Sequence, residues 1–317
     1  MLTKTELNRD FKWQGRDDVE DGQQGKRWHH VLANSTPDTD IGLLGFSCDL
    51  GVAENKGRVG AKEGPDAIRS ALANFAYHGQ ASVYDHGNLI ANAPLETSQQ
   101  SYASHLTDAL QKHRLVIALG GGHEIAWGTY QGLYSYLTQQ QPAKKIAIIN
   151  FDAHFDLRKP APNPSSGTPF YQVAKHCESN ARPFHYACLG VAEPANTQAL
   201  FDRADGLDVV YLRDQHCTVE NAQAKLAPML TDIDELYVTV CLDVFSADIA
   251  PGVSAPASLG VDRQFVIDML RWLWQQQAQM NYCWRVMDIA EMNPQFDIDN
   301  RTAKLAARLI YETTRML

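Results

Sequence analysis

Short apolar runs alternate with longer helical patterns along nearly the whole chain, and this alternation constrains the fold more than any other feature of the sequence. Helical periodicity is clearest over 65–76, 263–277 and 302–314. Strands that alternate with helices are typical of a mostly parallel sheet with helices on both faces. We therefore expect a three-layer α/β/α sandwich. Its expected eight strands are 41–46, 82–84, 115–119, 146–151, 186–190, 209–212, 236–242 and 285–289.

The size and charge of the chain limit its organisation and its partners. With 317 residues, 44% of them hydrophobic, the chain can bury a full core. We expect one domain over 1–317, with residues 1–40 as an N-terminal extension packed on it. The 28 basic and 37 acidic residues give a net charge of −9, which argues against binding to nucleic acid phosphates. A small-molecule partner is expected instead.

Cysteine spacing and hydropathy indicate the compartment. The six cysteines are scattered singly, without the dense framework of small secreted domains, and we expect them to be reduced thiols. The N-terminal segment is polar and lacks an apolar leader, and no stretch approaches the roughly 18 apolar residues of a membrane span. The sequence therefore predicts a soluble, cytoplasmic protein that does not associate with membranes.

Three ligand-type side chains follow the expected strand 146–151. Asp152, His154 and Asp156 stand two residues apart, so in extended chain they lie on one side. Such groups at a strand end repel one another unless a cation or hydrogen-bond donors compensate them. A bound divalent metal is one explanation. A polar turn after a strand is the other, and the triplet alone does not decide between them.

Two further strands end in residues of the same kind. His123 follows three glycines after the strand 115–119, and Asp243 follows the strand 236–242. In isolation, the glycines would form a plain turn and Asp243 would cap a helix. Because parallel strands place their carboxyl ends on one edge of a sheet, all five side chains can converge there.

Five segments resemble the ordered motifs of the arginase/agmatinase/formimidoylglutamase family of ureohydrolases. They are GRVGAKEGPDAIR, GGGHE, NFDAHFDLR, LDVFSADIAPGVSAP and VMDIAEMNP. The resemblance implies an arginase-like fold and two Mn²⁺ ions, one held by His123, Asp152, Asp156 and Asp243. Asp152, His154 and Asp243 would hold the second. Ligands of this kind suit Mn²⁺, and two such ions hold a bridging hydroxide near neutral pH, which would be the nucleophile.

The chain departs from the family pattern at two positions. Most relatives carry a second aspartate where this chain has Phe245, which cannot bind a metal, so the second ion would be weakly held unless Asp248 reaches the site. A His-Gly pair is replaced by Ser166-Gly167. Ser166 and Thr168 either donate hydrogen bonds to substrate or only form a turn, with Thr168 as the cap of the next helix.

The resemblance also implies a reaction. Glu291 matches the glutamate that pairs with the cationic group of the substrate, and Asp156 matches the proton shuttle of the family. The VSAP and SSGTPF segments resemble the formimidoylglutamase branch, so we expect hydrolysis of N-formimidoyl-L-glutamate to L-glutamate and formamide, a reaction of histidine degradation. The alternatives are a guanidino-hydrolase of the agmatinase or arginase type, which releases urea, and a non-catalytic relative that binds a metal or ligand.

A substrate with two carboxylates needs cationic partners. The basic residues of the expected active-site loops are candidates, with Arg58 preferred over Arg158, and either could instead be a solvated charge. Lys62 and Lys159 lie in the same loops. Members of the family commonly form homo-oligomers, and the resemblance allows one here.

Overall fold

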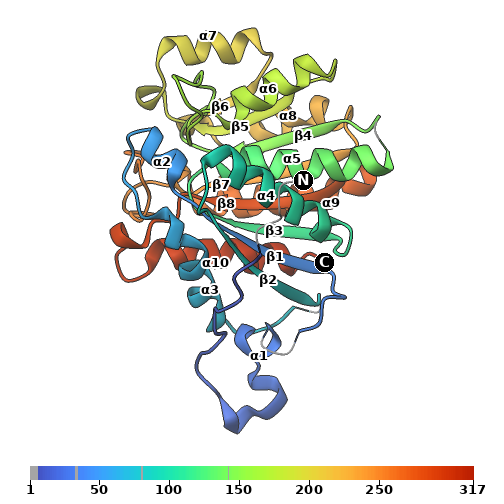
Figure 1. Cartoon of the computed structure of the whole chain (residues 1–317), viewed down its shortest axis with the longest axis vertical. Coiled ribbons are helices and arrows are strands. Elements are labelled where there is room, and N and C mark those ends of the chain that lie inside the picture. Colours follow the sequence, from blue (N-terminus) through green and yellow to red (C-terminus); the bar gives the residue numbers. More distant parts are fainter. Residues whose placement is uncertain (1–5, 33–34, 80, 142) are drawn as a thin grey trace.

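Eight parallel strands form a single sheet at the centre of the molecule (Figure 1). The computed structural model describes residues 6–32, 35–79, 81–141 and 143–317. Within these, each expected strand is present, and every pairing between neighbouring strands is parallel. The strands are β1 (Ile41–Ser47), β2 (Val83–Ile90), β3 (Leu115–Gly120), β4 (Ile146–Phe151), β5 (His185–Val191), β6 (Val210–Arg213), β7 (Glu235–Cys241) and β8 (Cys283–Ala290).

The spatial order of the strands is β2-β1-β3-β8-β7-β4-β5-β6. This order puts β3, β8, β7 and β4 side by side in the middle of the sheet. These four strands are the ones whose carboxyl ends precede the predicted metal ligands and Glu291. The sheet order thus brings together segments that are more than a hundred residues apart in the sequence.

Helices cover both faces of the sheet, which confirms the expected three layers. One face carries α1 (Trp28–Leu32), α3 (Gly64–Ala73), α8 (Val219–Leu230), α9 (Arg263–Met280) and α10 (Arg301–Thr314). The other carries α4 (Leu95–Leu110), α5 (Ile125–Gln140), α6 (Pro169–Ser179) and α7 (Gln198–Gly206). The shorter elements are α2 (Leu50–Glu54), η1 (Val19–Gly25), η2 (Ala61–Glu63), η3 (Glu193–Ala195), η4 (Asp214–His216), η5 (Leu242–Val244) and η6 (Pro294–Phe296).

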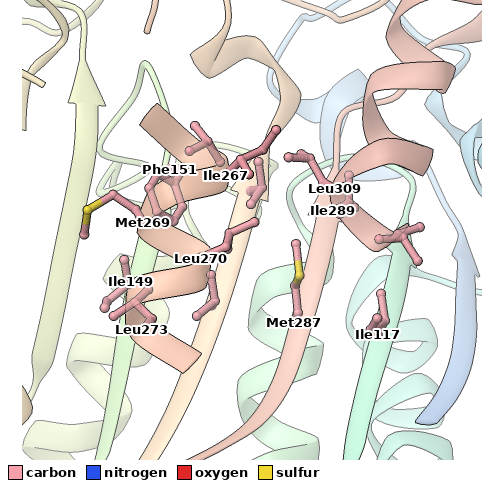
Figure 2. Close-up of a cluster of buried hydrophobic side chains, with 14 of the residues drawn as sticks. Ile117, Ile149, Phe151, Ile267, Met269, Leu270, Leu273, Met287, Ile289 and Leu309 are labelled. Atoms are coloured by element: carbon pink, nitrogen blue, oxygen red, sulfur yellow. The ribbon is translucent and has the colours of Figure 1, made fainter. Parts of the chain in front are cut away.

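Side chains alternate between the two faces because each strand is covered on both sides. In β3, Ile117 belongs to the core under α9 and α10, whereas its neighbours Val116 and Ala118 belong to the core under α4 and α5. Figure 2 shows Leu270 of α9 and Leu309 of α10 above the sheet. Each fully buried side chain of this size contributes roughly 1.5–3 kcal/mol.

The N-terminal segment contacts the sheet edge and α3. Asn8 pairs with Asn88 of β2, and Arg27 pairs with Ala76 just after α3. Trp28 is buried in the core beside α3. Part of the expected extension over 1–40, namely residues 1–5 and 33–34, lies outside the described residues. In the part of the chain that is described, no helix combines the length and apolarity needed to cross a bilayer.

Two buried histidines link β2 to the loop before β3. His113 Nδ1 lies 2.9 Å from the Thr39 carbonyl oxygen, which can only accept, so this nitrogen carries the proton. His113 Nε2 therefore accepts from His86 Nε2, 2.8 Å away. Burial, followed by the charge of His113, lowers the pKa of His86 to about 4. The pair is accordingly neutral in the folded protein.

This pair predicts a loss of stability in mild acid. The folded-state pKa of His86 lies below the unfolded value of 6.5, so the folded protein binds a proton at His86 less readily than the unfolded chain does. The contribution of neutral His86 to the unfolding free energy is therefore complete above pH 6.5 and is lost as the pH falls towards 4. Between pH 7.5 and pH 5, His86 should account for about 2 kcal/mol of the decrease in unfolding free energy. Urea unfolding at both pH values, compared with His86→Gln, measures this share. Gln can donate the same hydrogen bond but does not titrate, and an equal decrease in both proteins would contradict the prediction.

Candidate metal centre

The predicted ligands follow the carboxyl ends of three of the four central strands. His123 follows β3, Asp152 to Asp156 follow β4, and Asp243 lies in η5 directly after β7. Gly121 allows the turn after β3, because a Cβ at this residue would lie 1.8 Å from the Cys48 carbonyl oxygen. The structure thus brings all five predicted side chains to one edge of the sheet.

Asp152 lies between the two histidines. Its Oδ2 is 3.0 Å from His123 Nδ1, and its Oδ1 is 3.5 Å from His154 Nδ1. Asp156 Oδ2 is 2.8 Å from the same nitrogen of His123, and Asp243 Oδ2 is 3.2 Å from His154 Nδ1. One carboxylate can therefore serve two adjacent cation positions, one beside each imidazole.

The donor atoms suit a divalent cation. Among the described residues, His123 Nδ1 and Asp243 Oδ1 are buried and have no hydrogen-bond partner. His123 Nε2 lies 3.0 Å from Thr239 Oγ1, and the Thr239 hydroxyl bonds the Asp288 carboxylate. The Thr239 oxygen therefore accepts from Nε2–H, which leaves a lone pair on Nδ1 facing two carboxylates. A cation between these groups satisfies them all.

The electrostatics of the site favour added positive charge. Burial, and then the negative charge of Asp152, raises the pKa of Asp156 to about 6. The same two causes raise the pKa of Asp243. Burial disfavours the charged imidazoles, but their carboxylate neighbours outweigh it and raise the pKa values of His123 and His154. Positive charge stabilises this cluster, whether protons or a divalent cation supply it.

Glu291 lies beside the metal ligands at the end of β8. Its Oε1 accepts from the backbone N–H of His123 at 2.8 Å. Burial, followed by the negative charges of Glu124 and Asp243, raises its pKa to about 8. Both Glu291 and Asp156 have left-handed backbones, with φ of 70° and 48°, a conformation that concentrates at functional sites in residues other than glycine.

These groups, except Asp152, line one hollow of about 300 Å³, here named the metal hollow. Its size is at the lower end of the roughly 300–1,000 Å³ found for small-molecule sites. Of the residues predicted to contact substrate, Arg58, Arg158, Ser166 and Glu291 line it. The complete lining is Asn55, Lys56, Gly57, Arg58, His123, His154, Asp156, Arg158, Ser166, Cys241, Asp243, Ser254, Ala255 and Glu291.

Asp248 and Thr168 do not reach the metal hollow. Asp248 is exposed, and its backbone oxygen accepts from Arg301, because the chain turns outward after η5. Asp248 as a metal ligand is therefore wrong for this structure. Thr168 is buried and lines a second hollow, which shares some lining residues with the metal hollow. There its hydroxyl accepts from Ser165 N and donates to Gln172 Oε1. It stands at the start of α6 but makes no side-chain cap hydrogen bond.

Phe245 is fully buried in the core on the α9 side of the sheet. Its backbone pairs with Val261 in an isolated parallel bridge. The side chain points into the core, so this position offers the site neither a ligand nor an apolar wall. His123 Nδ1 and His154 Nδ1 each have two carboxylates within 3.5 Å, so the expected asymmetry stays a prediction.

The structure reverses the expected ranking of the basic residues. Arg58 donates from Nε to the Ser254 carbonyl oxygen at 2.9 Å and from Nη2 to that of Val253, and it lies 4.1 Å above the Phe296 ring. Arg158 is exposed, and its guanidinium makes no hydrogen bond or ion pair within the described ranges. Arg158 is thus the freer cation. Neither Lys62 nor Lys159 lines the metal hollow.

A polar network beneath His123 escaped the sequence analysis. Asp288, in the middle of β8, accepts from Tyr237 at 2.5 Å and from Thr129 at 2.8 Å, in addition to Thr239. Burial raises its pKa although these donors oppose the shift. A carboxylate inside the apolar strand 285–289 was the available signal, because a buried acid needs partners.

Comparison with known proteins identifies the family. The model of the arginase family matches residues 39–315. The chain belongs to the arginase family. This family member is 45% identical to a protein from Photobacterium profundum named formimidoylglutamase, across 96% of this chain and 94% of that one. It is 47% identical to a protein of the same name from Hahella chejuensis, across 94% and 92%.

Solved structures share the fold of this arginase-family chain. A formiminoglutamase from Trypanosoma cruzi, described with Mn²⁺, superposes with a TM-score of 0.80 at 22% identity over 92% of this chain and 98% of that one. A formimidoylglutamase from Bacillus subtilis superposes with a TM-score of 0.75 at 21% identity over 99% and 95%. The predicted three-layer arginase-like architecture is thereby confirmed.

The contact between Thr239 and His123 predicts an effect on metal affinity. Thr239→Val keeps the shape of the side chain but removes the acceptor for His123 Nε2–H, so the orientation and tautomer of the ring are no longer held. The affinity for Mn²⁺ should fall roughly 10- to 100-fold. Calorimetric titration of chelator-treated protein measures it. Thr239→Ser, which keeps the hydroxyl, should bind like the unmodified protein, and equal affinity in the valine variant would contradict the prediction.

Proposed function

We propose that this chain hydrolyses N-formimidoyl-L-glutamate to L-glutamate and formamide with the help of Mn²⁺. The observation that carries the proposal is the convergence of five ligand-type side chains beside Glu291, four of which line one hollow while the fifth, Asp152, lies between the two histidines. The name formimidoylglutamase, borne by relatives at 45% and 47% identity over more than nine-tenths of the chain, supports this substrate. The Trypanosoma cruzi structure with Mn²⁺ supports the choice of metal.

The proposed ligand sets follow the two sides of Asp152. His123, Asp152, Asp156 and Asp243 would hold one Mn²⁺, and Asp152, His154 and Asp243 would hold the other. Three of these residues, Asp152, His154 and Asp243, offer donor atoms that all lie within 4.8 Å of one another. When bound, the ions supply Lewis acidity and a nucleophilic water near neutral pH.

Glu291 and Asp156 have separate roles in this proposal. The formimidoyl group is a planar cation, and the Glu291 carboxylate, whose Oε2 is buried without a partner among the described residues, pairs with its N–H groups. Burial favours the protonated form of Glu291, and the positive charge of the bound formimidoyl group would stabilise the carboxylate in place of that proton. During hydrolysis the C–N bond to glutamate breaks and its nitrogen needs a proton. Asp156, which lines the metal hollow beside His123, takes a proton from the attacking water and delivers it to that nitrogen.

We also propose a cytoplasmic location. All six cysteines are free, and four of them are buried. Unpaired thiols are typical of proteins in reducing compartments.

Product analysis tests the proposed reaction. With added Mn²⁺, the protein should release formamide and L-glutamate from N-formimidoyl-L-glutamate and no urea from agmatine or arginine. Glu291→Gln should lower kcat/KM by roughly 100-fold or more, because it removes the charge that pairs with the substrate cation. Urea release from agmatine or arginine would instead indicate a guanidino-hydrolase. Turnover of none of the three substrates would indicate a relative that only binds.

The ligand asymmetry predicts unequal retention of two metal ions. In the ligand sets that the family resemblance implies, the ion beside His123 has four protein ligands and the ion beside His154 has three. After loading with Mn²⁺ and extended dialysis, metal analysis should find one ion per chain retained and a second lost. Two ions retained equally would refute this prediction.

A further inference from the structure

A lysine that the sequence analysis passed over stands where two hollows meet. Lys56 lines the metal hollow and also a neighbouring hollow, here named the outer hollow. Asn55 and Arg158 are the other residues that line both. The outer hollow is lined by Glu54, Asn55, Lys56, Arg158, Lys159, Ala161, Asn163, Ser165, Thr168, Thr197, Ala199, Leu200 and Arg203.

We infer that Lys56, together with Arg158, binds the two carboxylates of the substrate and thereby selects an amino-dicarboxylate over a cationic amine. This inference rests on the proposed function for the reaction at the other end of the substrate. It adds a residue that the motifs do not point to, and it assigns the junction of the two hollows a role in specificity.

The backbone holds Lys56 in an unusual conformation. Lys56 follows Asn55, the C-cap of α2, and has a φ of 60°, at a position where helices commonly place glycine. The turn is closed by bonds from Lys56 N to the Ala53 oxygen at 2.9 Å and from Gly57 N to the Val52 oxygen at 2.8 Å. Lys56 carries a side chain despite the steric cost of the left-handed region. The two hydrogen bonds of the turn hold the backbone from which this side chain extends.

The base of this turn is also tied to the metal centre. Gly51 N donates to Glu124 Oε1 at 2.9 Å, next to the predicted ligand His123. The Gly51 oxygen accepts from Ser166 N at 3.0 Å. Lys56, Asp156 and Glu291 are three of the eight described non-glycine residues with positive φ, and all three line the metal hollow. Three of the residues with a left-handed backbone therefore surround the metal hollow.

The charges in and around the site are separated. The carboxylates of Asp156, Asp243 and Glu291 line the metal hollow beside the two histidines. The outer hollow has four cationic side chains and one acid, Glu54. A molecule with a cationic formimidoyl group at one end and carboxylates at the other matches this polarity. Agmatine, with a cationic amine in place of the carboxylates, does not.

Lys56 and Arg158 are also free to bind. Neither side chain forms a hydrogen bond or ion pair with any residue that the structure describes, whereas Arg58 is held by two carbonyl oxygens. Arg158 packs beside Gly167, where an added Cβ would lie 2.9 Å from its Cδ. Two unpaired cations that both line the metal hollow and the outer hollow can each take one carboxylate.

Steady-state kinetics of the Mn²⁺-loaded protein test the inference. Lys56→Met should raise KM for N-formimidoyl-L-glutamate roughly 10- to 100-fold and change kcat by less than about threefold, since the contact is made equally in the ground and transition states. Lys56→Arg should restore most of the affinity. Lys62→Met, an exposed lysine of the same loop that lines neither hollow, should leave KM unchanged.

Two substrate analogues locate the contact. N-formimidoyl-L-glutamine lacks the side-chain carboxylate, and N-formimidoyl-4-aminobutyrate lacks the α-carboxylate. The KM penalty of Lys56→Met should vanish with one analogue and persist with the other. A KM equal to that of Lys62→Met, or the same penalty with both analogues, would overturn the role of Lys56.

Calorimetric binding of L-glutamate separates this inference from the proposed reaction. If the unmodified protein releases no formamide, the proposed function fails, yet weaker glutamate binding by Lys56→Met would still support the contact. If formamide is released and Lys56→Met binds glutamate as tightly as the unmodified protein, only the inference fails.

Discussion

The structure depends on the way in which one buried carboxylate, Asp152, is shared between two imidazoles. A parallel sheet gathers the ends of its strands at one edge, and here an acid or a histidine follows the end of each of β3, β4 and β7. Without compensation these groups would repel one another in a poorly solvated place. With a cation on either side of Asp152 the repulsion becomes attraction, so the same arrangement that costs folding free energy provides the binding site.

The residues beneath the metal hollow are held in place by hydrogen bonds. Asp288 is held by hydroxyl groups from β7 and α5, and through Thr239 it fixes the ring of His123. The rim above is different, because Lys56 and Arg158 are solvent-exposed and unpaired within the described structure. The Asp288 network therefore fixes the position of the His123 ring, whereas the side chains of Lys56 and Arg158 can adjust to the ends of a flexible substrate.

The sequence was sufficient for the sheet and for the convergence of the five ligand-type side chains, but not for the surroundings of these side chains. All eight strands were predictable because each is a short apolar run between helical segments, and the five ligands because each follows such a run. Lys56 was not, since nothing in the sequence shows that α2 ends there with a left-handed residue. The prediction of Asp248 as a ligand was wrong, because it relied on the short distance along the chain from Asp243. That distance does not reveal that the chain turns outward after η5. Arg58 was ranked too high because its carbonyl partners come from a segment almost 200 residues away.

The burial of Phe245 bears on how this chain could change over evolutionary time. Its ring occupies the core under α9, and its backbone pairs with Val261. Replacing it with aspartate would put a carboxylate among apolar side chains rather than in the metal hollow, unless the loop were rerouted at the same time. Substitution at residue 245 alone would therefore add no ligand to the metal hollow, which Phe245 does not line.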